Sequence, residues 1–196
     1  MQIDYYFSTI SPFTYLSGTR PAQVAAKHGA SLNYKPLDIM GLFGRTGGTP
    51  PKDRHENRKA YRLTEMRRAA AKLEMPINLQ PAHWPTNAAP SSYAIIAAVR
   101  DGSGDVADLV AGLTRACWAE EKDIAQDEVI GDCLVAAGFD RTLVDHDMMQ
   151  GAETYARNLE DAVKAGAFGA PFFIVGEEPF WGQDRIDDLD AYLAAV

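Results

Sequence analysis

An apolar strand that leads directly into a Ser-Pro helix start, close to the N-terminus, constrains this chain more than any other feature. Residues 2–7 alternate and are rich in aromatic side chains, which predicts a strand. Ser11 is a preferred N-cap residue, and Pro12 suits the first helical position because its φ is preset and its missing N–H needs no partner there. We therefore expect a helix beginning at Ser11, with unpaired N–H groups and the positive helix end facing one point.

The Ser11 hydroxyl is expected at that point, where the unpaired N–H groups favour an anion. A Ser-Pro pair can also simply begin a helix, and these residues alone leave both interpretations open. A second feature favours the functional one, because Pro171 stands immediately before the apolar segment 172–175. Proline cannot donate to a central ladder, so it should begin the strand or lie in a turn, and we predict a cis bond between Ala170 and Pro171.

The elements that follow the first strand indicate the fold class. A helix is predicted over 12–28 and a short strand over 31–37, which together imply a parallel strand pair with a right-handed crossover. A strand–helix start combined with a distant proline-led strand resembles the thioredoxin fold. The expected class is therefore α/β, a thioredoxin-like fold with an all-helical domain inserted between its βαβ and ββα halves.

The middle of the chain shows no strand pattern, so it is predicted to be helical. Residues 41–51 are rich in Gly, Thr and Pro and predict a loop, and an amphipathic helix is expected over 57–74. Further helices are predicted over 91–100, 106–121, 126–137, 141–149 and 155–165. These patterns divide the chain into a thioredoxin-like domain (1–40 and 152–196) and an inserted helical domain (41–151).

The C-terminal segment completes the sheet domain. The strand after Pro171 is followed by a tight turn at 176–178 and a short strand at 179–181, which predicts an antiparallel hairpin. A final helix is expected over 186–195.

Length and charge limit the classes of function. The 196 residues, 46% of them hydrophobic, can bury a sizeable core without disulfides or structural metal ions. A formal charge of −8 argues against nucleic acid as a partner. The densest basic segment, 52–72, fits either a solvated helix face or the lining for an anionic substrate. The sequence shows neither a secretory leader pattern nor an apolar run long enough to span a bilayer, so we expect a cytoplasmic protein without a membrane partner.

The cysteines do not form a redox motif. Cys117 and Cys133 are predicted to be buried helical thiols, with a disulfide or redox pair as the alternative, and no metal site is expected. Thiol–disulfide enzymes of the thioredoxin fold carry C-x-x-C at the helix N-terminus. In this chain the same four places hold Ser11, Pro12, Phe13 and Thr14. The site therefore suits the stabilisation of a thiolate supplied by another molecule, for which glutathione is the obvious donor.

Three motifs together carry a family resemblance. Residues 11–16 (SPFTYL), 168–176 (FGAPFFIVG) and 180–185 (FWGQDR) resemble the 2-hydroxychromene-2-carboxylate isomerases, relatives of kappa-class glutathione transferases and of DsbA-like oxidoreductases. The similarity spans essentially the whole chain, and the two C-terminal motifs are the specific ones. The resemblance implies a homodimer that interconverts 2-hydroxychromene-2-carboxylate and trans-o-hydroxybenzylidenepyruvate-type compounds by reversible addition of a glutathione thiolate.

The resemblance also implies roles for residues of the glutathione site. It makes Ser11 the catalytic residue, with the glutathione sulfur beside it, and it pairs the glutathione backbone with Ala170. The γ-glutamyl end is expected near Asp184, which could accept the ammonium group or merely cap the last helix. The implied cofactor-binding residues are Ser11, Pro12, Phe13, Ala170, Pro171, Trp181, Gln183, Asp184 and Arg185.

The implied substrate-binding residues include two departures from the family pattern. Gly48 stands where asparagine is usual in a G-N-x-P-P motif, and Arg58 stands where lysine is usual. The missing amide and the changed cation alter the groups that the second substrate meets. The expected substrate contacts are Gly48, Arg58, Tyr61, His83 and Trp84, although a loop histidine such as His83 is also compatible with simple solvation.

Other functions fit parts of the same pattern. A kappa-like glutathione transferase would use the same thiolate but release a conjugate. A DsbA-type redox protein is disfavoured by the missing C-x-x-C, and a binding module without catalysis stays open.

Overall fold

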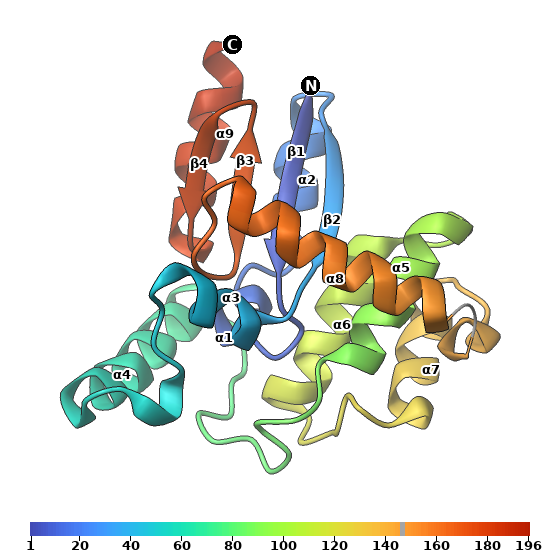
Figure 1. The fold of residues 1–196 in the computed structure, drawn as a ribbon, viewed down its shortest axis with the longest axis horizontal. Helices are drawn as coiled ribbons and strands as arrows, with labels where there is room; N and C mark the ends of the chain where they lie inside the picture. The colour runs from blue at the N-terminus through green and yellow to red at the C-terminus, as the bar shows by residue number, and fades with distance from the viewer. Residues whose placement is uncertain (146–147) are drawn as a thin grey trace.

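A computed structural model describes residues 1–145 and 148–196 of the chain. Within these residues the strands form one four-stranded sheet in the order β2-β1-β3-β4 (Figure 1). β1 (Gln2–Phe7) pairs in parallel with β2 (Ser31–Pro36) and antiparallel with β3 (Phe172–Val175), which pairs antiparallel with β4 (Glu178–Trp181). This topology confirms the predicted thioredoxin-like α/β class with a helical insertion.

Aromatic stacking fixes the centre of the sheet. The ring centroid of Tyr5 lies 4.6 Å from that of Phe7 and 4.8 Å from that of Phe173, which is its cross-strand partner. All three side chains are almost completely buried. Large aromatic pairs contribute both buried area and specific geometry, so the strand ends that carry the site are held on a rigid platform.

The predicted helix over 12–28 is two helices, which corrects the sequence-based expectation. α1 (Pro12–Tyr15) makes a single turn, and α2 (Arg20–Lys27) follows after a break. Gly18 has a φ of +54°, and Pro21 has no N–H to continue an uninterrupted helix across the break. Since only a few peptide dipoles align in α1, its macrodipole is much weaker than that of a long helix.

The predicted loop over 41–51 is largely helical, which is a second correction. α3 (Ile39–Thr46) begins at Asp38, whose carboxylate accepts a 2.9 Å hydrogen bond from the Met40 N–H, and ends at Gly47 with a φ of +76°. Good capping at both ends outweighs the glycine content of the segment. A short 3₁₀ turn, η1 (Pro51–Asp53), leads into α4 (Glu56–Lys72), which confirms the amphipathic helix predicted there.

The remaining helices of the insertion gather beside the lower end of the sheet, with α8 crossing from them toward β3 (Figure 1). They are α5 (Ala89–Asp101), α6 (Val106–Ala119), α7 (Asp127–Ala136), the 3₁₀ turn η2 (Arg141–Val144) and α8 (Met148–Lys164).

The helix predicted over 141–149 is therefore wrong for residues 141–144, which form the 3₁₀ turn, and residues 146–147 lie outside the described part. α8 begins earlier than the predicted residue 155. The expected domain boundary after residue 151 falls inside α8, and the domain division stays a prediction.

The two thiols are free and lie in helices, as predicted. Cys117 of α6 is buried, and burial raises its pKa to about 12. Cys133 of α7 is partly buried, and burial raises its pKa to about 11. Both groups are therefore protonated at neutral pH and far less nucleophilic than a thiolate.

The C-terminal end follows the expected order. The β3–β4 hairpin is confirmed, and a 3₁₀ turn, η3 (Gln183–Arg185), precedes α9 (Ile186–Ala195). Among the described residues, we find no helix with the length and apolar character needed to cross a bilayer.

Candidate functional site

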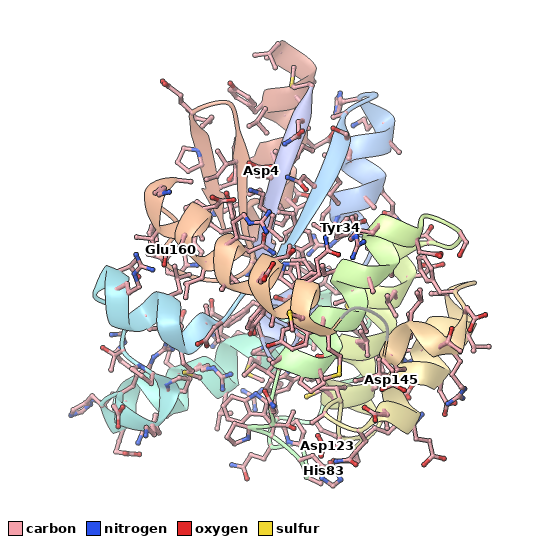
Figure 2. All side chains as sticks on the ribbon, turned by 45° about the vertical axis from the view of Figure 1, so that its right-hand side comes forward. Asp4, Tyr34, His83, Asp123, Asp145 and Glu160 are labelled. Atoms are coloured by element: carbon pink, nitrogen blue, oxygen red, sulfur yellow. The ribbon has the colours of Figure 1, made fainter. Side chains whose placement is uncertain are left out.

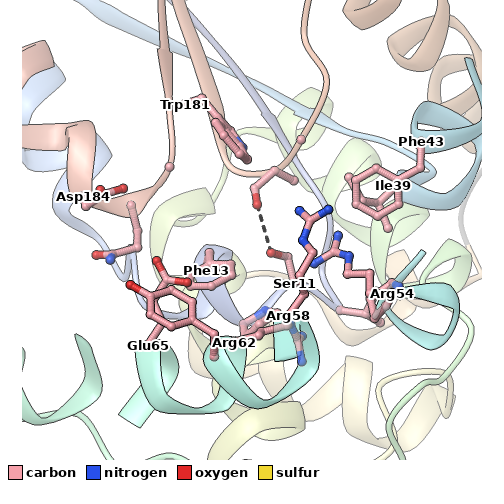
Figure 3. Close-up of a pocket in the computed structure, with 18 of the residues that line it drawn as sticks. Ser11, Phe13, Ile39, Phe43, Arg54, Arg58, Arg62, Glu65, Trp181 and Asp184 are labelled. Atoms are coloured by element: carbon pink, nitrogen blue, oxygen red, sulfur yellow. Dashed lines mark hydrogen bonds between the residues drawn. The ribbon is translucent and has the colours of Figure 1, made fainter. Parts of the chain in front are cut away.

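A cavity of about 630 Å³ lies at the end of the sheet where the two proline motifs meet. Its walls come from the start of α1, from α3, from α4, and from the segments that flank β3 and β4. Figure 3 shows Ser11 with the labelled residues of these walls around it. This volume falls within the range of small-molecule sites.

Ser11 connects the helix start to the proline loop. Its hydroxyl oxygen accepts a 3.3 Å hydrogen bond from the Thr14 N–H, as expected of an N-cap, and its hydroxyl donates a 3.2 Å bond to the Ala170 carbonyl (Figure 3). The Ala170–Pro171 peptide is cis, which confirms that prediction. The serine hydroxyl and the peptide before Pro171 therefore share one wall of the cavity.

The Trp181 indole lies over the same loop. A Cβ at position 169 would overlap this indole, so Gly169 is required for the close approach. The Trp181 ring also contacts Phe168, with centroids 4.7 Å apart, while about half of its side chain is exposed. The indole thus forms an apolar edge of the cavity.

The opposite wall is basic. Arg54, which precedes α4, and Arg58 and Arg62 on α4 all line the cavity. Burial lowers the pKa of Arg62 to about 10, and the neighbouring charge of Arg54 contributes. Burial also lowers the pKa of Arg54, with a further contribution from Arg58. A pKa of about 10 leaves the Arg62 guanidinium charged at neutral pH.

One end of the cavity is acidic. Glu65 on α4 and Asp184 of η3 both line it, and Figure 3 shows them on the same side. Burial raises the pKa of Glu65, and the negative charge of Asp184 raises it further. A cation placed between the two carboxylates would relieve their repulsion.

Asp184 does not cap α9. The capping role that the sequence left open for this residue is therefore excluded. The residue before α9 makes no side-chain capping bond, and the Asp184 carboxylate instead accepts a 3.0 Å bond from Arg185. Arg185 also donates a 2.9 Å bond to Asp188, so its guanidinium is already engaged by two carboxylates. Arg20 holds Gln183, donating to its side-chain oxygen at 3.1 Å and to its backbone carbonyl at 3.0 Å.

Most of the residues singled out in the sequence line this cavity. They are Ser11, Pro12, Phe13, Arg58, Tyr61, Trp84, Ala170, Trp181, Gln183, Asp184 and Arg185. The Trp84 indole N–H donates a 3.0 Å bond to the Ile10 carbonyl, which fixes the 81–87 connection against the start of α1.

Three of the expected residues lie outside the cavity lining. Pro171 is buried behind it, and its carbonyl accepts a 3.0 Å bond from the Gly182 N–H. A Cβ at Gly48 would meet the Phe43 side chain, and Phe43 itself lines the cavity, so the substrate contact expected at Gly48 stays a prediction. His83 is exposed and lies beside Asp123 at the edge of the molecule (Figure 2), and the substrate contact expected there also stays a prediction.

Sequence reasoning missed several residues of the α3–α4 side. The most informative are Phe43, Arg54, Arg62 and Glu65. Arg58 and Arg62 are four residues apart, which is the spacing of neighbours on one helix face, and this was the available signal; Arg54 precedes the helix. The sequence did not say which face of α4 would turn toward the cavity.

Residues 2–194 match the profile of the DSBA-like thioredoxin domain. The chain belongs to this family. It is 28% identical over 194 residues to the 2-hydroxychromene-2-carboxylate isomerase of Sphingobium xenophagum, with 97% of each chain covered. It is 27% identical over 201 residues to the enzyme of the same name from Pseudomonas putida, covering 100% of this chain and 96% of the other. The resemblance predicted from the motifs is confirmed.

Solved structures agree at the level of the fold. A 2-hydroxychromene-2-carboxylate isomerase superposes with a TM-score of 0.79 at 24% identity, covering 100% of this chain and 95% of the other. The cytosolic disulfide reductase DsbM of Pseudomonas aeruginosa, in a structure with GSH, superposes with a TM-score of 0.72 at 18% identity, covering 100% and 98%. Both comparisons show the DsbA-type thioredoxin fold.

Proposed function

We propose that this family member is a glutathione-dependent isomerase of the 2-hydroxychromene-2-carboxylate isomerase type. The observation that carries the proposal is the Ser11 hydroxyl, 3.2 Å from the carbonyl oxygen of the residue before Pro171, in a cavity whose opposite wall is basic. The relatives of that name, which match over the whole length of this chain, support the same assignment.

The residues present fit glutathione. Among the described residues, the Ala170 N–H has no hydrogen-bond partner, so it is available to pair with a peptide group of a ligand lying along the loop. Glu65 and Asp184 offer two carboxylates to an ammonium group such as that of the γ-glutamyl end. The cavity lining contains no cysteine, so a reactive sulfur has to come from a ligand.

Bound glutathione would supply a thiolate that adds reversibly to a conjugated double bond and thereby permits rotation about it. Ser11 would stabilise that sulfur by turning its hydroxyl donor from the Ala170 carbonyl toward it. The single-turn helix α1 adds little dipole, so the hydroxyl and the basic wall account for most of the stabilisation. Lowering the pKa of the bound thiol by one or two units corresponds to about 1.4 to 3 kcal/mol of thiolate stabilisation.

The basic and apolar walls suit an aromatic enol or ylidene-pyruvate substrate. Arg58 would bind its carboxylate, since a guanidinium pairs with a carboxylate through two parallel hydrogen bonds. Phe43 and Trp181 would contact its ring from the apolar edges of the cavity. The expected homodimer and cytoplasmic location stay predictions.

The alternative is a kappa-like glutathione transferase, which would use the same residues but release a conjugate. The two activities differ in thiol consumption, because an isomerase returns glutathione unchanged. Product analysis with chlorodinitrobenzene and with an o-hydroxybenzylidenepyruvate, together with a thiol count, distinguishes them.

The first test is the ultraviolet thiolate absorbance on adding glutathione, titrated from about pH 5 to about pH 9. A thiolate band that persists well below the ordinary thiol pKa of about 8.5 supports the proposal. Folded protein that produces no such band and binds no glutathione at millimolar concentration overturns it.

A further inference from the structure

The three arginines of the basic wall form no salt bridge within the described residues, in contrast to several other arginines of the chain. Arg45, Arg115 and Arg141 each form an ion pair with a nearby carboxylate. Among the described residues, no ion pair is formed by Arg54, Arg58 or Arg62. Three arginines that form no salt bridge therefore face one cavity, in a protein whose formal charge is −8, although the Glu65 charge raises the pKa of Arg62.

These charges lie close enough to act on one another. The Arg58 charge lowers the pKa of Arg54, and the Arg54 charge lowers the pKa of Arg62. Mutual repulsion of this kind destabilises the protein without a ligand and is relieved by bound negative charge. Two negative charges relieve it more than one.

Packing holds two of the three guanidinium groups in place. The Arg62 guanidinium carbon lies 5.1 Å from the ring centroid of Trp84 and 5.9 Å from that of Trp118. Arg54 lies 5.6 Å from the Phe43 ring centroid, and its Nε donates a 2.8 Å bond to the Thr49 carbonyl. A guanidinium stacked on an aromatic face keeps its N–H edge free to bind an anion.

We propose that Arg54 and Arg62 bind a second carboxylate of the substrate, so that the natural substrate is an unsaturated dicarboxylate. This inference rests on the proposed function, in which Arg58 binds the first carboxylate. Glutathione also carries two carboxylates, so the same wall suits its glycine end chemically. The second carboxylate could thus come from the substrate or from glutathione. Saturating glutathione distinguishes them, because it leaves a substrate site open and fills a cofactor site.

The test is calorimetric titration with isophthalate, an aromatic dicarboxylate, and with benzoate, its monocarboxylate counterpart, with and without saturating glutathione. We expect isophthalate to bind about tenfold more tightly than benzoate in both conditions, because each guanidinium–carboxylate pair adds a charge-assisted bidentate contact. Arg54→Gln should reduce the preference to about twofold or less. Arg68→Gln, on the exposed side of the same helix, should leave it unchanged.

Arg62→Gln should also reduce the preference, but it removes the packing against Trp84 and Trp118. Its thermal unfolding is therefore measured alongside, and Arg54→Gln keeps the test decisive if Arg62→Gln unfolds. Equal affinity for isophthalate and benzoate, or binding of neither, overturns the dicarboxylate site. Displacement of isophthalate by glutathione assigns the arginines to the cofactor and also overturns it. A preserved preference in a protein that binds no glutathione supports the dicarboxylate site and overturns the proposed function alone.

Discussion

The two walls of the cavity are built in different ways. The wall with Ser11, Ala170 and Trp181 comes from strand ends and a cis-proline loop, and it is held by the Ser11–Ala170 hydrogen bond, the Gly182–Pro171 main-chain bond and the aromatic centre of the sheet. The wall with Arg54, Arg58 and Arg62 comes from one helix face and the turn before it. The first wall has a local sequence signature, whereas the second depends on how α4 packs.

This difference predicts that the two walls bind different ligands. A wall built on strand ends and a cis-proline loop suits a constant ligand such as glutathione, because the fold itself fixes its geometry. A wall of long side chains can change without disturbing the sheet, and it suits the variable substrate. Substitutions on the first wall should therefore affect the binding and activation of glutathione, and substitutions on the second should affect the binding of the substrate.

The largest effect is expected at Ser11. Ser11→Ala should lower activity at pH 7 by about 10- to 100-fold, the equivalent of one or two pKa units of the bound thiol. It also removes the N-cap bond to Thr14, at a cost of about 1 kcal/mol in the free energy of unfolding.

Steady-state kinetics with the thiolate absorbance, and thermal unfolding of the same variant, separate these two effects. The matched control is Ser17→Ala, since the Ser17 hydroxyl donates to the Phe13 carbonyl at 2.9 Å but lies outside the cavity lining. An unchanged rate and thiolate band in Ser11→Ala would remove Ser11 from the mechanism.

A smaller, pH-dependent effect is expected at Glu65. Its pKa is raised, so its carboxyl takes up a proton at a higher pH than an ordinary glutamate and then no longer attracts an ammonium group. Between about pH 7 and about pH 5 the wild type should lose about threefold more glutathione affinity than Glu65→Gln.

Calorimetry at the two pH values measures this difference, with Glu153→Gln on α8 as an exposed control. Identical pH dependence in the wild type and Glu65→Gln would show that Glu65 does not take part in binding the ammonium group.

The smallest effect concerns Gly48, on the side of the substrate wall. A Cβ at this position would overlap the Phe43 ring and lie 3.0 Å from its Cα, so Gly48→Ala should lower the free energy of unfolding by about 1 kcal/mol or more. Gly44→Ala, in the interior of α3 with open space around it, should instead raise it by up to about 1 kcal/mol.

Chemical denaturation of the two variants provides the comparison. Equal free energies of unfolding for Gly48→Ala and Gly44→Ala would mean that Phe43 moves aside without cost. Packing would then not explain why glycine stands at position 48.

Local signals in the sequence determined the first wall. Ser11-Pro12 specifies a capped helix start, Pro171 cannot donate to a ladder, and the alternation of β1 and its apolar partner strand specifies a buried sheet. These are effects of adjacent residues, so they are readable without knowing the rest of the fold. Arg58 was identified through the family resemblance and not through such a local signal.

The tertiary structure alone decided the second wall. The periodicity of α4 is compatible with arginines in solvent, and only its packing turns Arg54 and Arg62 toward Ser11 and places Phe43 over Gly48. The break between α1 and α2 was likewise decided by the tertiary structure: Gly18 adopts a left-handed conformation there, so α1 is much shorter than the helix that the sequence predicted. Charge and capping are encoded locally, whereas the direction in which a helix face points is a property of long-range packing.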